Sequence, residues 1–275
     1  MAPEIRSLGT FLSQSRSVAV LSGAGISTAS GIPDYRDRNG NWKQSRPIQY
    51  GEFVASVAVR RRYWARSFVG WQRFSLAQPN PAHVALADLE SSGRVDTLIT
   101  QNVDGLHSAA GSRRVIDLHG DLGKVRCMGC DSVHRREDFQ RALRAANPGW
   151  RAEAGVIRAD GDAELAGDDV ADFAVPACPR CGGILKPDVV MFGESVPKDR
   201  VREAMDAVDR ADALLVVGSS LTVFSGYRFV RHASASGKPI AIVNQGCTRA
   251  DDIASLKVDG DCARVLPAVI EAMAA

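Results

Sequence analysis

The sequence predicts an α/β protein built on a Rossmann-like open parallel sheet, with a small zinc-binding module and a helical insertion. Three observations support this prediction: short apolar runs rich in branched residues recur, helical patterns lie between them, and two stretches break the alternation. Strands that are apolar throughout are typical of parallel sheets buried on both faces. Their alternation with helices favours a single open sheet with right-handed crossovers.

The expected strands each end in Gly, Ser, Asn or His, and they are the runs at 17–25, 95–102, 114–120, 212–220 and 239–246. A helix is expected over 81–93, because Asn80-Pro81 is a cap and first-turn signal and Gly93 is a stop signal. Residues 198–211 carry an apolar stripe opposite charged residues, which is typical of an amphipathic helix. A further helical pattern, "RVLPAVIEAMAA", closes the chain.

The two exceptions divide the chain into three predicted parts. Residues 37–80 are aromatic and basic and predict the helical insertion. Residues 126–184 hold two cysteine pairs around an acidic centre, where we expect mobility, and predict the zinc-binding module. The Rossmann-like part then comprises 1–36, 81–125 and 185–275.

Bulk composition excludes several classes of protein. The 275 residues are 45% hydrophobic and 24% charged, with a net charge of +2, so no nucleic-acid partner is required. No apolar run approaches the ~18 residues of a membrane span, and the N-terminus lacks a secretory signal. We therefore expect a bacterial cytoplasmic monomer with no membrane contact, and a mitochondrial location is the weaker alternative.

The cysteine pairs are the strongest chemical signal. Cys127 and Cys130 form one C-x-x-C pair, and Cys178 and Cys181 form the other. Two such pairs can deliver four thiolates to a tetrahedral structural Zn²⁺ with no open position for water. A redox dithiol is the main rival, but redox motifs of this kind come singly and early in a βαβ unit. The separation of 47 residues between the pairs exceeds the usual zinc-ribbon spacing of about 15–20.

A glycine-rich turn follows the first expected strand. In "SGAGISTASGIPDYRD", Gly23 and Gly25 would let the backbone approach a ligand, and the next helix start would suit a phosphate. Thr28 stands where a dinucleotide fingerprint has its third glycine, so a plain strand–helix turn is an equal alternative. The polar tail "PDYRD" favours the ligand interpretation.

Polar residues cluster at several strand ends, where open α/β sheets bind ligands. They are the "TQNVDGLH" run (100–107), "HG" at 119–120, "GSS" at 218–220 and "NQG" at 244–246. Each has a structural alternative as a cap or turn residue. His119 emerges at a strand tip beside Asn102 and Asp104, which favours a general base. The other four histidines lack that context, and we interpret them as structural.

The motifs "GAGISTASGIPDYR", "TQNVDGLH", "LHG", two C-x-x-C pairs, "KPDVVMFGE", "GSSLTV" and "VNQG" occur in this order over nearly the whole chain. In this respect the chain resembles a sirtuin, an NAD-dependent protein-lysine deacylase. The stretches "RYWARSFVGW", "PNPAH" and "CGGILKPDVVMFGE" resemble the class II branch.

The resemblance implies roles for matching positions. His119 would be the base, while Asn102 and Asp104 would line the nicotinamide pocket. Val190, Phe192 and Gly193 would flank the acyl-lysine peptide by added strand pairing. Tyr35 stands where many sirtuins carry Phe. The NAD-binding set would be Gly23, Ala24, Gly25, Ile26, Asp34, Tyr35, Arg36, Gln101, Asn102, Asp104, Gly218, Ser219, Ser220, Asn244, Gln245, Gly246 and the backbone near Cys262.

The implied chemistry is acyl transfer to a sugar. The acyl oxygen would attack C1′ of the nicotinamide ribose, nicotinamide would leave, and His119 would then remove a ribose hydroxyl proton. Products would be free lysine, nicotinamide and O-acyl-ADP-ribose. The sugar carbon would become oxocarbenium-like and would react with stray water, and the departing amide would need fixed partners. The polar side chains at the strand ends would meet these two needs.

Acyl preference and rival functions stay open. Tyr63 and Arg66 resemble the pair that sirtuins preferring acidic acyl chains use, because an Arg in an apolar pocket binds a carboxylate well. The alternative is that Arg66 belongs to a solvated basic face. A mono-ADP-ribosyltransferase with the same NAD site and a non-catalytic zinc-and-nucleotide module are the rival functions.

Overall fold

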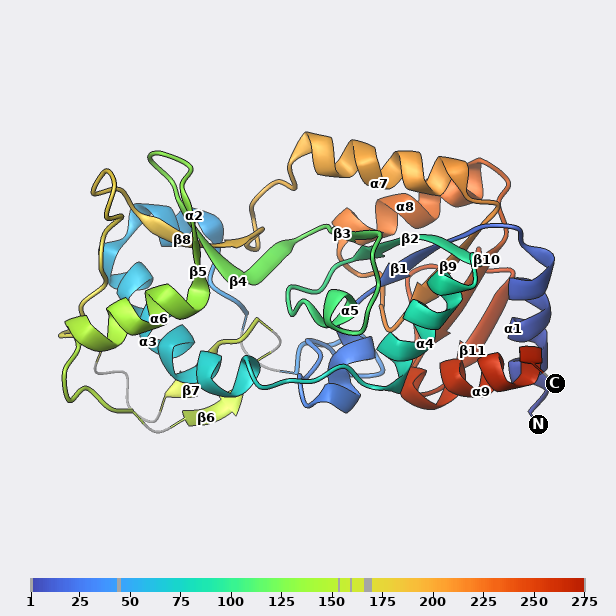
Figure 1. Cartoon of the computed structure of the whole chain (residues 1–275), viewed down its shortest axis with the longest axis horizontal. Coiled ribbons are helices and arrows are strands. Elements are labelled where there is room, and N and C mark those ends of the chain that lie inside the picture. Colours follow the sequence, from blue (N-terminus) through green and yellow to red (C-terminus); the bar gives the residue numbers. More distant parts are fainter. Residues whose placement is uncertain (1, 44–45, 153, 159, 166–169, 275) are drawn as a thin grey trace.

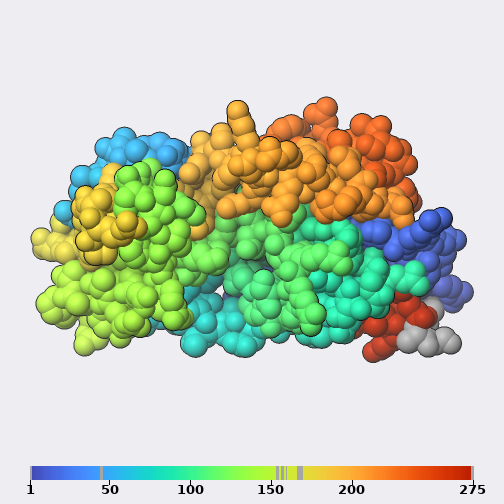
Figure 2. All heavy atoms as spheres, turned by 45° about the horizontal axis from the view of Figure 1, so that its top comes forward, coloured from blue at the N-terminus to red at the C-terminus, as the bar shows by residue number. Residues whose placement is uncertain are grey.

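The chain folds into two lobes lying side by side, with both termini in the larger one (Figure 1). This computed structural model describes residues 2–43, 46–152, 154–158, 160–165 and 170–274. The large lobe holds a six-stranded sheet and its covering helices. The small lobe holds a three-stranded sheet, three helices and a hairpin. Figure 2 shows the green and yellow small-lobe residues at one end and the orange helices along the rim of the large lobe.

The large-lobe sheet is parallel throughout, in the order β11-β10-β9-β1-β2-β3. Its strands are β1 (Val18–Ser22), β2 (Val95–Thr100), β3 (Val115–Asp117), β9 (Ala213–Val217), β10 (Ile240–Asn244) and β11 (Leu256–Asp259). This is the Rossmann order, and it reverses between β1 and β9. A crevice for a ligand is therefore expected beyond the carboxyl ends of those two strands.

Helices cover both faces of this sheet, and alternate residues of β1 point to opposite faces. Val18 and Val20 pack towards α1 (Pro3–Gln14), α4 (Pro81–Ser91) and α9 (Cys262–Ala274). Ala19 and Leu21 pack towards α7 (Lys198–Arg210) and α8 (Phe224–Ala235). All five residues of β1 are buried, so the predicted parallel sheet with continuous apolar strands is confirmed.

The predicted helices are present with small differences at their ends. Helix α4 begins at Pro81, and the Asn80 side chain accepts a hydrogen bond from the Ala82 amide at 2.9 Å. It ends at Ser91, two residues before the predicted stop. Helix α9 begins at Cys262 and contains Pro267. Two short helical segments, η1 (Ala24–Ser30) and α5 (Leu106–Ala109), follow β1 and β2.

The small lobe is centred on the antiparallel sheet β5-β4-β8. Its strands are β4 (Gly120–Cys127), β5 (Val133–Arg135) and β8 (Leu185–Val189), and its helices are α2 (Tyr50–Ala55), α3 (Val57–Phe74) and α6 (Arg136–Ala146). One apolar cluster joins the aromatic helices to the cysteine segment, with Trp64, Phe139 and Phe173 at its centre. The helices expected between residues 37 and 80 therefore share their core with the expected metal module.

The acidic centre, where we expected mobility, contains regular structure in its described residues. Strands β6 (Ala154–Ile157) and β7 (Ala163–Leu165) pair antiparallel as a hairpin. Residues 153, 159 and 166–169 of this stretch lie outside the described residues. The hairpin lies against α3, at the base of the small lobe (Figure 1).

The chain crosses between the lobes four times, before α2, before α4, at the start of β4 and after β8. The crossing at Gly120 is tight: φ is +90°, and a Cβ there would lie 2.1 Å from the Asp188 carbonyl oxygen. Among the described residues, no helix combines the length and apolarity that a membrane crossing requires.

Candidate active site

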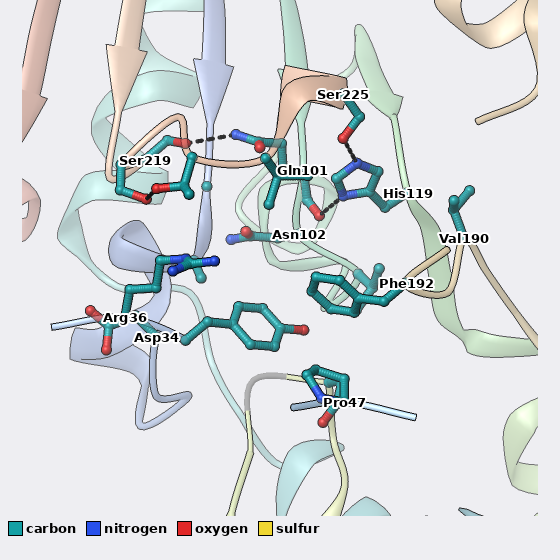
Figure 3. Close-up of a pocket in the computed structure, with 18 of the residues that line it drawn as sticks. Asp34, Arg36, Pro47, Gln101, Asn102, His119, Val190, Phe192, Ser219 and Ser225 are labelled. Carbon is teal, nitrogen blue, oxygen red and sulfur yellow. Dashed lines mark hydrogen bonds between the residues drawn. The ribbon is translucent and has the colours of Figure 1, made fainter. Parts of the chain in front are cut away.

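A cavity of about 630 Å³ lies between the lobes, beyond the carboxyl ends of β1, β2, β9 and β10 (Figure 3). It lies at the switch point of the sheet, as expected for this fold. Predicted site residues on its wall are Gly23, Ala24, Gly25, Asp34, Tyr35, Arg36, Tyr63, Gln101, Asn102, Asp104, His119, Val190, Phe192, Gly193, Gly218, Ser219, Ser220, Asn244 and Gln245. The tips of β1 and β9 thus converge with small-lobe residues on one space.

The glycine-rich turn closes against the end of β9. The Gly25 amide donates to the Gly218 carbonyl at 2.8 Å, and the Gly23 amide donates to that of Val217 at 3.0 Å. Gly218 has a φ of +61°, and a Cβ there would lie 2.3 Å from the Ile26 nitrogen. The backbone of the turn at 23–26 therefore contacts the backbone at 217–218 directly. The glycines of the turn also carry no side chain that would keep a ligand away from its other side.

His119 is held in a defined tautomer. Its Nδ1 lies 2.9 Å from the Gln101 carbonyl oxygen, which can only accept, so Nδ1 carries the proton. Its Nε2 therefore accepts from the Ser225 hydroxyl at 2.7 Å (Figure 3). Burial lowers the pKa of His119 to about 4; the Gln101 contact opposes this, and Arg200 and Arg228 add to it. The imidazole is thus neutral at pH 7, and its basic lone pair, on Nε2, accepts the Ser225 hydroxyl.

Asn102 and Asp104 are joined through Ser27, which the sequence did not single out. The Ser27 hydroxyl donates to Asp104 Oδ2 at 2.7 Å, and Asn102 Nδ2 donates to that hydroxyl at 3.0 Å. Asp104 Oδ1 accepts from the Leu106 amide at 3.0 Å, capping α5. Burial raises the pKa of Asp104, against these hydrogen bonds. The three side chains form a fixed polar wall rather than a set of independent caps.

Buried polar groups support this wall from behind. The Asn102 amide donates to Thr100 Oγ1 at 3.1 Å, as does the Ser22 hydroxyl at 2.9 Å. His107 Nε2 lies 2.8 Å from Ser22 Oγ, and its ring centroid lies 4.8 Å from that of His83. Burial lowers the pKa of His107 to about 3 and that of His83 to about 4. Both rings are therefore neutral structural groups.

A second set of contacts fixes the opposite side of the cavity. Gln101 Nε2 donates to Ser219 Oγ at 2.9 Å (Figure 3) and to the Ser22 carbonyl at 3.1 Å. Asn244 Nδ2 donates to the carbonyls of Gln245 and Gly246 at 3.0 and 3.3 Å. Side chains at the ends of β2, β9 and β10 are therefore held in place by hydrogen bonds within the protein.

Aromatic rings cover the side of the cavity formed by residues 34–37, 42, 47 and 48. Tyr35, Trp42 and Phe192 contact one another edge to face, with centroids 5.7–6.1 Å apart. The Arg36 guanidinium lies 4.2 Å from the Trp42 ring centroid. The Val190 amide donates to the His119 carbonyl at 2.7 Å, so the segment after β8 is tied to the histidine. These contacts would exclude water from the region around His119.

The four paired cysteines converge at the far end of the small lobe. Their sulfur atoms all lie within 4.8 Å of one another. Tetrahedral Zn²⁺ with Zn–S bonds of about 2.3 Å needs sulfur separations of about 3.8 Å, so the thiols fit this ion. The residue after each pair has a left-handed backbone conformation: φ is +54° at Asp131 and +71° at Gly182. No cysteine of this cluster lines the cavity, which fits a structural site.

Four of the residues predicted to bind NAD or the substrate do not line the cavity. Ile26 and Cys262 are buried in the apolar core, and Gly246 packs against Arg38. Arg66 pairs with Asp162 instead of facing the cavity. Sequence reasoning missed Ser27, Ser225, Asp160 and Asp162. "SGYRF" was a signal for Ser225, because it follows "GSSLTV" at the strand end, and the Asp-Gly-Asp triplet was the only signal for the aspartates.

Residues 23–225 match the sequence model of the Sir2 family. The chain is 55% identical over 267 residues to an NAD-dependent protein deacetylase of Bordetella bronchiseptica, covering 97% of each. It is 50% identical over 269 residues to the mitochondrial NAD-dependent protein lipoamidase sirtuin-4 of Bos taurus, covering 97% of this chain and 85% of that protein. A solved complex of Sir2 with a p53 peptide and NAD⁺ superposes with a TM-score of 0.80 at 33% identity, covering 98% of both chains.

Proposed function

The chain belongs to the Sir2 family, and on that premise we propose how it works as an NAD-dependent protein-lysine deacylase. The reaction transfers the acyl group of a modified lysine to ADP-ribose, releasing nicotinamide and O-acyl-ADP-ribose. One observation carries the proposal: a neutral imidazole, His119, shares a cavity wall with the Asn102–Ser27–Asp104 group. NAD, when bound, supplies the sugar carbon that accepts the acyl oxygen.

His119 would take up the proton of a ribose hydroxyl on Nε2. The Gln101 carbonyl holds the proton on Nδ1, so the basic lone pair is fixed on Nε2. Ser225 now donates to that lone pair, and its hydroxyl would turn away when a ribose hydroxyl takes its place. Positive charge on the imidazole would be stabilised by the same Gln101 carbonyl. Ser225 would therefore be a second residue in contact with the nitrogen that takes up the proton.

The polar wall would hold the nicotinamide end of NAD. Its carboxamide offers a carbonyl acceptor and an amide donor, which match the Asn102 amide and the Asp104 carboxylate. The glycine-rich turn at 23–25 would accept the phosphates, and Ser219 with Asn244 would face the adenosine half. These assignments follow the positions of the residues along the cavity, from Asp104 towards Asn244.

The peptide would enter between two segments of the cavity wall, 190–193 and 221–223, and pair with them as an added strand. We propose that the active unit is a monomer. We propose a cytoplasmic enzyme with the three-part division given by residues 1–36, 81–125 and 185–275, then 37–80, then 126–184. A net charge of +2 supports a function without nucleic acid or membrane.

The test is incubation of the protein with NAD and an acetyl-lysine peptide, followed by mass spectrometry. We expect nicotinamide and O-acetyl-ADP-ribose in equal amounts. His119→Ala should reduce turnover by about a hundredfold or more, as loss of a general base does, while NAD binding by calorimetry stays within about twofold.

The matched control is His232→Ala. His232 lies on α8 and pairs with Asp209 at 2.6 Å outside the cavity, so its loss should leave turnover unchanged. Full turnover by His119→Ala would overturn the base assignment. ADP-ribose attached to protein, with no O-acetyl-ADP-ribose, would instead favour the mono-ADP-ribosyltransferase.

A further inference from the structure

The turn between β6 and β7 places two carboxyl groups on the wall of the cavity. Asp160 and Asp162 both line it, together with Tyr63. All three belong to the small lobe, as does Pro47, and Figure 3 shows Pro47 and Ser219 on opposite sides of the pocket. An acyl chain that passes His119 away from the NAD-binding strand ends would therefore meet this turn.

Backbone contacts hold the described residues of this turn, 158 and 160–162. The Arg158 amide donates to the Asp162 carbonyl at 2.8 Å, and the Gly161 amide donates to that of Arg158 at 3.1 Å. Gly161 has a φ of +70°. A Cβ on Gly70 of α3 would lie 2.2 Å from the Gly161 carbonyl oxygen, so the helix backbone touches the turn directly.

The Arg66 guanidinium is already bound to a protein carboxylate. Its Nε donates to Asp162 Oδ1 at 3.0 Å, and its Nη2 lies 2.9 Å from Oδ2, although the angle at Nη2 is poor for a hydrogen bond. The pair is buried, with side-chain exposures of 17% and 5%. Asp162 lies on the cavity wall and Arg66 does not, so an acyl carboxylate would meet the Asp162 carboxyl group before it met Arg66.

The described residues around the turn include more carboxyl groups than guanidinium groups. Asp160, Asp162 and Glu164 face two guanidinium groups, Arg66 on Asp162 and Arg158 on Glu164 at 2.6 Å. Burial, and then the neighbouring Asp160, raises the pKa of Asp162 to about 7. Burial raises the pKa of Asp160 as well. Asp160 and Asp162 already disfavour each other's ionisation. A further carboxylate beside them would be repelled for the same reason.

We propose that Asp160 and Asp162 make the acyl pocket selective for chains with an uncharged end that offers an N–H or O–H donor, and against dicarboxylic chains. This inference rests on the proposed deacylase function and names its substrate class. Arg66 is then a positioning residue that holds Asp162, and Tyr63 lines the same wall. The competing prediction, in which Tyr63 and Arg66 receive an acyl carboxylate, is tested by the same experiment.

The test uses two lysine peptides whose acyl groups have the same shape, glutaryl and its terminal amide, 4-carbamoylbutanoyl. Turnover with NAD and peptide affinity by fluorescence polarisation are both measured. We expect the amide peptide to exceed the glutaryl peptide by about tenfold or more in kcat/KM and in affinity, because a polar pocket rejects a mismatched group strongly. Asp162→Asn should reverse the ratio, since it removes one charge and frees Arg66.

Asp160→Asn is the second variant, and it should lower the amide preference by about tenfold even if Asp162→Asn does not fold. Asp172→Asn, an exposed acid of the same lobe that is off the cavity wall, should keep the wild-type ratio. A glutaryl preference that Arg66→Met abolishes would overturn the proposal. If no peptide is turned over, the deacylase function fails, and the binding ratio still decides the selectivity.

Discussion

The two lobes are stabilised in different ways. In the large lobe, β1, β9 and β10 are buried on both faces, and apolar side chains fill both layers between sheet and helices. The small lobe has short antiparallel strands, a cluster of four thiols and several buried charges. Arg136 is 1% exposed and lies 5.4 and 5.0 Å from the ring centroids of Trp64 and Trp71.

Apolar packing therefore forms the large-lobe sheet, whereas thiols and paired charges stabilise the lobe that supplies part of the cavity wall. Apolar burial gives the large lobe a rigid edge on which polar strand ends are held in fixed positions. The small lobe places Tyr63, Asp160 and Asp162 on the cavity wall, and it contains the thiol cluster and the Arg66–Asp162 pair. Under the proposed function, NAD recognition would belong to the large lobe and acyl selectivity to the small lobe.

The largest expected effect is loss of zinc. Structural zinc contributes on the order of 10 kcal/mol to folding in small modules, so Cys127→Ala or Cys178→Ala should unfold the small lobe and abolish activity. Trp64 and Trp150 pack in the core of that lobe, so tryptophan fluorescence reports mainly on it. Hydrogen exchange of β1 and β9 should stay slow. A metal-free variant with native fluorescence and full turnover would contradict this comparison.

Next in size is truncation of an apolar core residue. Leu215 in β9 is fully buried, and Leu215→Ala should lower the free energy of unfolding of the large lobe by about 3 kcal/mol. Zinc content and tryptophan fluorescence should not change. Leu143→Ala, an equally buried residue of α6, is the matched variant and should affect the fluorescence transition first. Equal effects of both variants on both transitions would show that the lobes unfold as one unit.

Acid should destabilise the large lobe by a smaller step for each histidine. His83 and His107 have folded pKa values of about 4 and 3, below the value of about 6.5 expected when unfolded. Between those limits the unfolded chain binds more protons, so stability is lost as pH falls from 6.5 towards 4. At pH 5, each of these histidines should lower the free energy of unfolding by about 2 kcal/mol relative to neutral pH. Urea denaturation at pH 7.5 and 5 checks this, and His107→Gln should remove about half of the joint pH dependence of these two histidines; an unchanged dependence would refute their assignment.

The smallest effect is expected from exposed ion pairs. Arg141 and Asp138 on α6 pair at 2.6 Å with largely exposed side chains. Arg141→Ala should change the free energy of unfolding by about 0.5 kcal/mol at most. Arg202→Ala on α7, whose partner Asp199 is also exposed, is the large-lobe counterpart. A clearly larger loss for Arg141 would mean that surface charge also contributes to small-lobe stability.

Residues whose role depends on local pattern were predictable. Five large-lobe strands were evident because they are apolar throughout, and His119 because it follows the end of one of them. Strand β11 was not predicted, because only Val258 of its four residues is buried. The cysteine pairs were evident from spacing alone. The Arg66–Asp162 pair was not, because its partners are 96 residues apart and no spacing rule links them. Ser27 was equally hidden, since only the fold brings it to Asp104, 77 residues away.

The order of the strands along the chain has a consequence for synthesis. Strand β1 lies between β2 and β9, but β9 begins only at Ala213, after the last cysteine of the thiol cluster at 181. On the ribosome, the central strand therefore waits without one neighbour while the segment that captures metal emerges completely. Zinc uptake can thus precede closure of the nucleotide crevice, because all four thiols have emerged before β9 can pair with β1.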